Sequence, residues 1–403
     1  MLPRYEVVAR RRPVELARPG PVPAPYAAVS ADGTPELTLA GGAVTLAATW
    51  SDQVALHVTI GGRTTTHRSR RSARPGAAVD AVALTLTGPQ VTAFTRESGA
   101  WVARARYDLT DRHDVHDETW LAGLESSHEL GRFGQLGLRD LRAVTHADGS
   151  PYDRDGRPLL TATSAGPGGF PTGHTSVWSL DPGTLELEHR ADLFLRRDGV
   201  YGDHAAHLLR DGDRWLLAAS TWGDFDRHRR PVGVTLAEST EDLTRGVHVL
   251  DSRPLTLPTH GFRSVGTWDP HLVRTDEGWL VGYVSATRYF RFHPVLAAGP
   301  DLDSLVLHAV AEDHRQTEGT TLVRLDGEWR VLASDKQRRV YPVLDLDLRE
   351  VGTLDAAYPT NIPWPTLVGD LLVGFNGAAY GGRLLGYGSH GEVVIQRAVT
   401  PTP

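Results

Sequence analysis

The sequence contains no cysteine among its 403 residues. Disulfide bonds, thiolate nucleophiles and cysteine-ligated zinc are therefore excluded. Only one lysine is present, Lys336, so almost all basic residues are arginine. The N-terminal segment lacks an apolar core of signal-peptide length, and no segment approaches a membrane span. We therefore expect a cytoplasmic protein, or a secreted one if a leader was removed, with no membrane partner.

The overall charge of the chain is moderately acidic. The formal net charge is −7, whereas a nucleic-acid partner would require a basic face. The sequence also lacks a phosphate-binding glycine loop and a dinucleotide-binding glycine motif after a strand, so no nucleotide cofactor is expected. An uncharged substrate is compatible with this composition. The oligomeric state is not indicated by the sequence.

Signals for helices are scarce. One amphipathic segment, residues 117–130, predicts a helix, and most of the remaining chain consists of short apolar runs broken by Gly, Pro and Asp-Gly turns. This pattern predicts an all-β protein. We expect a β-sandwich-like domain over residues 1–115, a helical connector over 116–136, and a second domain over 137–403. The best predicted strands of the first domain are residues 54–60, 81–86, 90–95 and 101–107.

The second domain repeats one pattern. Each repeat has an apolar strand, an acidic or glycine turn and a second strand, and three of the second strands open with a tryptophan. Such units, spaced 43 to 66 residues apart, leave room for two further strands each, which is typical of the blades of a propeller. The sequence therefore predicts a five-bladed β-propeller. The repeats are residues 139–164, 203–220, 269–285, 318–334 and 361–376.

Polar residues stand just before the first strand of each repeat. Innermost strands line the channel of a propeller, so we expect these side chains to converge at one mouth. Four carboxylates crowded there would repel one another, and the pKa of at least one would rise. Glycosidic cleavage needs such a pair of states, one carboxyl protonated and another ionised. The five positions are Asp140, Asp203, Asp269, Glu318 and Asn361.

The acids do not align perfectly. If His207, His271 and Thr321 are equivalent, then Asp269 lies two residues upstream, Glu318 three and Asp203 four. Alternation along a strand would direct the first two to opposite faces. We therefore expect β-bulges or a turn where the strands begin, which Gly202 and Gly319 would accommodate.

The order Asp203, Asp269-Pro270 and Glu318-Gly319 resembles the five-bladed propeller glycoside hydrolases of families 43 and 32. The resemblance covers about residues 137–398 and implies that Asp203 is the base or nucleophile. It further implies that Asp269 orients the substrate and tunes pKa values, and that Glu318 is the general acid. Asp140 competes for the first role, because blades one and two both lie two steps from blade four. Two fructosidase motifs of this group are absent, so the sugar stays open.

Several further residues are candidates for substrate binding. Sugars need polar partners for their hydroxyls and an aromatic platform for the apolar ring face. Trp268 and Trp364 are the candidate platforms, and the other candidates are Arg139, His174, His204, His207, His271, Lys336 and Asn361. No catalytic metal is expected, although the resemblance allows a structural ion in the channel. A glycoside phosphorylase or transglycosidase, with Arg139, Lys336 and Arg338 holding phosphate, and a non-catalytic carbohydrate-binding propeller are the alternatives.

Overall fold

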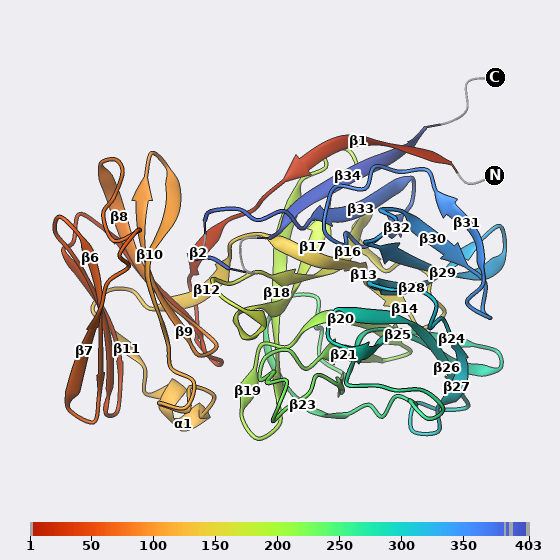
Figure 1. Cartoon of the computed structure of the whole chain (residues 1–403), viewed down its shortest axis with the longest axis horizontal. Coiled ribbons are helices and arrows are strands. Elements are labelled where there is room, and N and C mark those ends of the chain that lie inside the picture. The colour runs from red at the N-terminus through yellow and green to blue at the C-terminus, as the bar shows by residue number, and fades with distance from the viewer. Residues whose placement is uncertain (1–2, 383, 387–389, 400–403) are drawn as a thin grey trace.

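The computed structural model of this chain describes residues 3–382, 384–386 and 390–399. It contains two parts built almost entirely from strands, a sandwich formed from the N-terminal region and a propeller (Figure 1). The all-β prediction is confirmed. Among the described residues, no helix has the length and apolarity needed to cross a bilayer.

The sandwich consists of two antiparallel sheets around one apolar core. The four strands predicted for this region from the sequence are all present, within β6, β8, β9 and β10. Alternating side chains along these strands face the partner sheet, which is why short apolar–polar repeats fold this way. One sheet has the order β10 (Ala100–Asp108), β9 (Gln90–Glu97), β8 (Val79–Thr87), β3 (Tyr26–Asp32), β12 (Gly131–Gln135) and β2 (Glu15–Arg18). The other has β11 (Glu125–Ser126), β4 (Glu36–Gly41), β5 (Val44–Trp50), β6 (Val54–Ile60) and β7 (Arg63–His67).

The predicted helix over residues 117–130 is mostly absent. Only α1 (Glu118–Ala122) is helical, capped by the Asp117 carboxylate, which accepts a hydrogen bond from the Thr119 amide. Gly123 ends it, and the following residues join the sandwich as β11 and β12. The apolar residues of the amphipathic pattern are nevertheless buried, because Trp120, Leu121 and Leu124 pack into the sandwich core.

Five four-stranded antiparallel units make up the propeller. The predicted five blades are thus confirmed, and each predicted hairpin forms the two inner strands of a blade. Blade one is β13 (Leu138–Ala143), β16 (Arg157–Ser164), β17 (His174–Leu180) and β18 (Leu187–Arg196), and blade two is β20 (His204–Asp211), β21 (Arg214–Ser220), β22 (Val234–Ser239) and β23 (Gly246–Pro254). Blade three is β24 (Thr267–Thr275), β25 (Gly278–Arg288), β26 (Arg291–Gly299) and β27 (Val306–Val310), and blade four is β28 (Thr317–Leu325), β29 (Glu328–Asp335), β30 (Tyr341–Leu344) and β31 (Glu350–Leu354).

The fifth blade joins the two ends of the chain. Its inner strands are β32 (Thr366–Val368), β33 (Leu371–Asn376) and β34 (Glu392–Val399), and its outermost strand is β1 (Arg4–Arg11). The predicted domain limits placed residues 4–11 in the sandwich, but these residues pair with β34 along the propeller (Figure 1). The ring of blades is closed in this way by backbone hydrogen bonds between the two ends.

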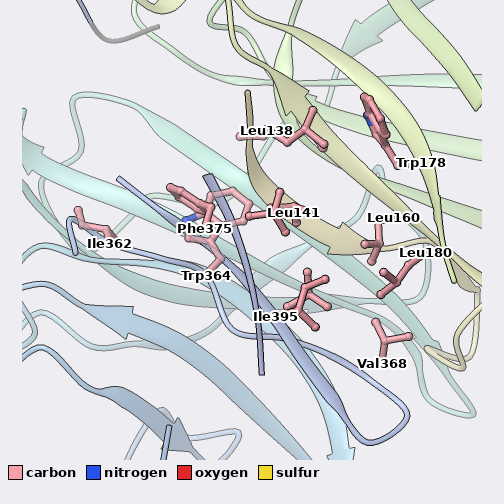
Figure 2. Packing of buried hydrophobic residues seen from close by; sticks show 14 of the residues in the cluster. Leu138, Leu141, Leu160, Trp178, Leu180, Ile362, Trp364, Val368, Phe375 and Ile395 are labelled. Carbon is pink, nitrogen blue, oxygen red and sulfur yellow. The ribbon is translucent and has the colours of Figure 1, made fainter. Parts of the chain in front are cut away.

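Blades one and five pack through a large apolar cluster. Leu138 and Leu141 of β13 meet Trp364, Phe375 and Ile395 of blade five (Figure 2). Each fully buried side chain of this size contributes about 1.5–3 kcal/mol relative to its exposed state. This packing fixes β13 beside the segment that carries Trp364, and both contribute to the site described below.

Short elements complete the structure. Blades one and two are linked by parallel pairing of their outer strands, β18 and β23. The remaining short strands are β14 (Thr145–His146), β15 (Asp153–Arg154) and β19 (Val200–Tyr201), and one 3-10 turn spans Phe170–Thr172.

Candidate active site

The inner strands of blades one to four share a β-bulge at the same level. The pairing register shifts between Arg139 and Arg142, between His204 and His207, between Trp268 and His271, and between Glu318 and Thr321. The residue that opens each bulge has a positive φ, namely Asp140 at 52°, Ala205 at 54°, Asp269 at 56° and Gly319 at 73°. A bulge interrupts the strict alternation of side chains, so positions two and three residues upstream can face the same side. Bulges are therefore present, and they reconcile Asp269 with Glu318. Gly319 lies within the bulge of blade four, whereas Gly202 precedes the bulge of blade two, which does not bring Asp203 into line.

These bulges surround a cavity of about 500 Å³ at one end of the propeller. All five blades contribute to its lining, as expected for residues placed where the inner strands begin. Eight of the predicted site residues lie in this lining, namely Asp140, His204, Trp268, Asp269, Glu318, Lys336, Asn361 and Trp364.

Three carboxylic acids from different blades meet in the cavity. Asp140 of blade one and Asp269 of blade three are only 6% and 2% exposed, and Glu318 of blade four is partly exposed toward the cavity. Burial, together with the charge of Asp140, raises the pKa of Glu318 to about 8. Burial and then the charge of Glu318 raise the pKa of Asp269 well above its ordinary value. At neutral pH the cluster therefore retains protons that isolated carboxyls would have lost.

Asp140 has the strongest cationic surroundings of the three. Burial raises the pKa of its carboxyl, and the charges of Arg139 and Arg142 and a hydrogen bond with Thr163 oppose that rise. The Arg139 Nε lies 3.4 Å from the Asp140 Oδ2. Nearby, the His204 Nε2 is 3.0 Å from the Phe170 carbonyl oxygen, and burial followed by the Arg139 charge holds the pKa of His204 well below its usual range. The imidazole is thus neutral, and the arginines favour an ionised Asp140.

Two indole rings flank Glu318. The N–H groups of Trp268 and Trp364, with the charge of Lys336, counter the rise in the pKa of Glu318. Within the described residues, the Trp364 Nε1 is buried and makes no hydrogen bond of standard geometry. The absence of a side chain at Gly319 allows the Trp364 ring to pack against the backbone next to Glu318, because a Cβ at Gly319 would lie 2.5 Å from the Trp364 Cδ1. The amide of Gly319 also donates to the Asp269 Oδ2 at 3.2 Å, which ties blade four to blade three.

Arg142 was not predicted as a site residue, yet its fully buried guanidinium lies beneath the acids. It donates to the carbonyl oxygens of Thr320 (2.9 Å) and Asp269 (3.1 Å) and to the Thr321 Oγ1 (2.7 Å). Its centre also lies 4.6 Å from the Trp364 ring. Because it starts in blade one and contacts blades three, four and five, Arg142 occupies the channel. In the sequence, the alternation Arg139-Asp140-Leu141-Arg142 at the start of the first repeat could have indicated that Arg142 lies near the acids.

The structure places Asp203 away from the cavity lining. Its buried carboxylate pairs with Arg197, and its Oδ1 accepts a hydrogen bond from the Gly223 amide at 3.0 Å. At the bulge of blade two, the position matching Asp140 and Asp269 is Ala205. The structure therefore brings together Asp140, Asp269 and Glu318. Asp203 instead joins Arg197, which follows β18 of blade one, to Gly223, which follows β21 of blade two.

His207 and His271 also lie outside the lining and connect adjacent blades. The His207 Nδ1 accepts from the Leu272 amide at 3.1 Å, and the His271 Nδ1 accepts from the Leu322 amide at 3.4 Å. Their rings stack with centroids 4.0 Å apart, and the His207 Nε2 lies 3.1 Å from the Thr145 Oγ1. Burial holds the pKa of each histidine well below its usual range. These contacts describe neutral rings that hold blades two, three and four in register.

His174 belongs to the contact between sandwich and propeller. Its Nε2 is 3.2 Å from Asp192 Oδ1, and the fully buried Asp192 also receives Arg18 Nη1 at 3.2 Å and Arg132 Nε at 3.1 Å. Arg18 and Arg132 come from β2 and β12 of the sandwich. The structure thus places His174 in an ionic interface between the two parts and outside the cavity lining.

The other twelve residues of the lining were not predicted. The first strand of each blade begins at the cavity, so the antiparallel second strand ends there, and the loops after β21 and β25 bring aromatic residues to the cavity. The position of these aromatic residues just after the second strands could have indicated this from the sequence. The additional lining residues are Phe170, Ala205, Trp222, Phe225, Arg227, Tyr289, Phe290, Phe292, Gln316, Ile362, Phe375 and His390.

The residues in the channel do not suit a structural metal ion. Among the described residues, no group of three or more His, Asp or Glu side chains is arranged to hold one. The Arg142 guanidinium already places a positive charge on the carbonyl oxygens of Thr320 and Asp269, which would otherwise be available to a cation. We therefore derive no chemical step through a metal.

No family model and no curated protein matches the chain. Among solved structures, it resembles the family 32 β-fructofuranosidase of Bombyx mori, with 15% identity, a TM-score of 0.48 and coverage of 67% of this chain and 62% of that one. It also resembles the family 43 enzyme of Xanthomonas citri complexed with xylose, with 13% identity, a TM-score of 0.44 and coverage of 66% and 88%. For the sucrose-6-phosphate hydrolase of Lactobacillus gasseri the values are 12%, 0.46, 66% and 60%. The solved structures that this fold resembles include glycoside hydrolases of families 32 and 43, and these likenesses concern the fold alone.

Proposed function

We propose that this protein hydrolyses a glycosidic bond, with Glu318 as general acid and Asp140 as nucleophile or base. One observation carries the proposal: carboxyls from blades one, three and four meet in a single cavity, and the pKa of Glu318 is raised to about 8. Glu318 is then protonated at neutral pH, as the donor to a leaving oxygen must be. Asp140 takes the place that the sequence prediction favoured for Asp203.

The reaction follows from these positions. The bond between the anomeric carbon and the glycosidic oxygen breaks while that oxygen takes the proton of Glu318. The anomeric carbon bonds either to Asp140 or to a water from which Asp140 removes a proton. In the first route the ionised Glu318 then takes a proton from a water, whose oxygen bonds to the anomeric carbon as the bond to Asp140 breaks. Arg139 and Arg142 favour the ionised state of Asp140 that both routes need. The negative charge of Asp140, together with burial, favours the protonated state of Glu318. Asp269, which accepts a hydrogen bond from the Gly319 amide, orients the substrate in this proposal.

Trp268 and Trp364 suit the apolar face of a sugar ring, and Lys336 and Asn361 suit its hydroxyls, since all four line the cavity. A cytoplasmic location, as the sequence predicts, would favour short oligosaccharides or small glycosides. The phosphorylase alternative loses one expected phosphate ligand, because the Arg338 guanidinium pairs with Glu350 at 2.6 and 3.0 Å.

A substrate screen tests this proposal. Wild-type protein is assayed with aryl furanosides and pyranosides, with and without phosphate, beside Glu318→Gln and the exposed control Glu312→Gln. We expect hydrolysis of at least one glycoside without phosphate. Glu318→Gln should lose about 10²–10⁴-fold in turnover of substrates with poor leaving groups, and Glu312→Gln should retain wild-type activity. Equal activity of Glu318→Gln and wild type would refute the assignment.

A further inference from the structure

The cavity is divided into two chemically different halves. One half, the acid half, contains Asp140, Asp269, Glu318, Lys336, Asn361 and His390. The other half, the aromatic wall, consists of Phe170, Trp222, Phe225, Tyr289, Phe290 and Phe292. The acid half offers enough polar groups for one glycosyl unit. The aromatic wall presents mainly ring faces, with Arg227 beside Tyr289 as a polar neighbour in the lining, so it offers few partners for a second unit.

The rings of the aromatic wall support one another. Phe170 stacks on Trp222 with centroids 4.4 Å apart, and Phe225 meets Trp222 edge-on at 5.0 Å and Tyr289 at 5.3 Å. The hydroxyl of Tyr289 donates to the Val265 carbonyl at 3.4 Å, so it is directed at the backbone. Burying the several hydroxyls of a second sugar against these ring faces would cost free energy, because most of them would lose water without gaining a partner.

Phe290 extends the aromatic wall into solvent. It is 76% exposed and adopts φ = 70° at the turn between β25 and β26. A bulky residue is rare in this left-handed region, and such strained positions concentrate at ligand sites. A large exposed ring held in this way at the cavity lining is suited to cover an apolar ligand.

The general acid lies next to the aromatic wall through Trp268. The indole of Trp268 acts on Glu318, and its ring packs against Trp222 and Phe292, each with centroids 5.6 Å apart. A leaving oxygen protonated by Glu318 is therefore beside the aromatic wall. We infer that the natural substrate is a glycoside of a single sugar whose leaving group is a flat apolar or aromatic alcohol. This inference rests on the proposed hydrolysis and specifies its substrate class.

The inferred substrate class is tested with glycosides whose leaving groups have similar acidity. For the sugar found in the screen, the hydrolysis of benzyl and methyl glycosides is compared with that of a disaccharide. Benzyl alcohol and sugar hydroxyls are both alkyl alcohols, so the comparison reports contacts with the leaving group. We expect kcat/KM for the benzyl glycoside to exceed both others at least about tenfold. A disaccharide hydrolysed as well as the benzyl glycoside would overturn the inference.

Binding separates this inference from the proposed function. Benzyl and methyl 1-thioglycosides of every sugar in the screen are titrated calorimetrically into wild type, Phe290→Ala, Phe225→Ala and the exposed blade-three control Val306→Ala. We expect a benzyl preference in wild type and Val306→Ala that falls at least about threefold in the two aromatic-wall variants. A preference for benzyl over methyl ligands without turnover of any glycoside would overturn the proposed hydrolysis and support the apolar site. Turnover of a glycoside without this preference would support the hydrolysis and overturn the inference about the leaving group.

Discussion

Replacing Glu318 by glutamine should stabilise the protein at neutral pH. The pKa of Glu318 is about 8 in the folded protein and near 4.5 in an unfolded chain. Between these values the folded state binds a proton that the unfolded state has lost, so this residue makes stability fall as pH rises from 4.5 to 8. The full effect at pH 7 is about 3 kcal/mol, and solvent in the cavity reduces it to about 1–2 kcal/mol.

Glutamine cannot titrate, so the variant removes this dependence. Urea unfolding of wild type, Glu318→Gln and Glu312→Gln at pH 4.5 and pH 7 measures the difference. We expect Glu318→Gln to gain about 1–2 kcal/mol over wild type at pH 7 and almost nothing at pH 4.5, with Glu312→Gln unchanged at both. A variant that is equally stable or less stable than wild type at pH 7 would refute the reasoning, because the Glu318 carboxyl would then not have a raised pKa in the folded protein.

Three further predictions concern the site. In hydrolysis, kcat/KM should fall about tenfold between pH 7 and pH 9 as Glu318 loses its proton, and a midpoint near pH 4.5 would contradict this. Arg142→Met should lower kcat/KM about 10²-fold. It should also move the acidic limb of the pH–rate profile to higher pH, because Arg142 lowers the pKa of Asp140 and of Asp269. An acidic limb that stays in place would show that Arg142 has no such role. Gly319→Ala should lower the melting temperature more than Gly327→Ala, since both have positive φ but only a Cβ at Gly319 meets Trp364, and equal losses would contradict this account.

The blades could be predicted because each hairpin is local in sequence. Alternating apolar residues, a turn and a tryptophan recur within about 17 residues, and short-range pairing turns that pattern directly into two strands. The closure of the ring could not be predicted in the same way. Arg4 pairs with Val399, so β1 finds its partner at the far end of the chain, and no local pattern indicates such a contact.

The site was partly predictable for a similar reason. Asp269 and Glu318 were correctly expected to need bulges, and both line the cavity. The sequence prediction favoured Asp203 over Asp140 because of the resemblance of the order Asp203, Asp269-Pro270, Glu318-Gly319 to families 43 and 32. In the structure Asp203 lies two residues before Ala205, which opens the bulge of blade two. In the sequence, Asp140 already has the same offset as Asp269 if Arg142 is taken as the equivalent position, and the bulges of blades one and three confirm that match.

The most direct test of the account compares Asp140→Asn with Asp203→Asn on a glycoside that the wild type hydrolyses. Both residues are buried aspartates of the propeller, and folded protein is matched by circular dichroism and melting temperature. The account predicts that Asp140→Asn loses at least about 10³-fold in kcat, while folded Asp203→Asn stays within about tenfold of wild type. An active Asp140→Asn beside an inactive, folded Asp203→Asn would contradict it.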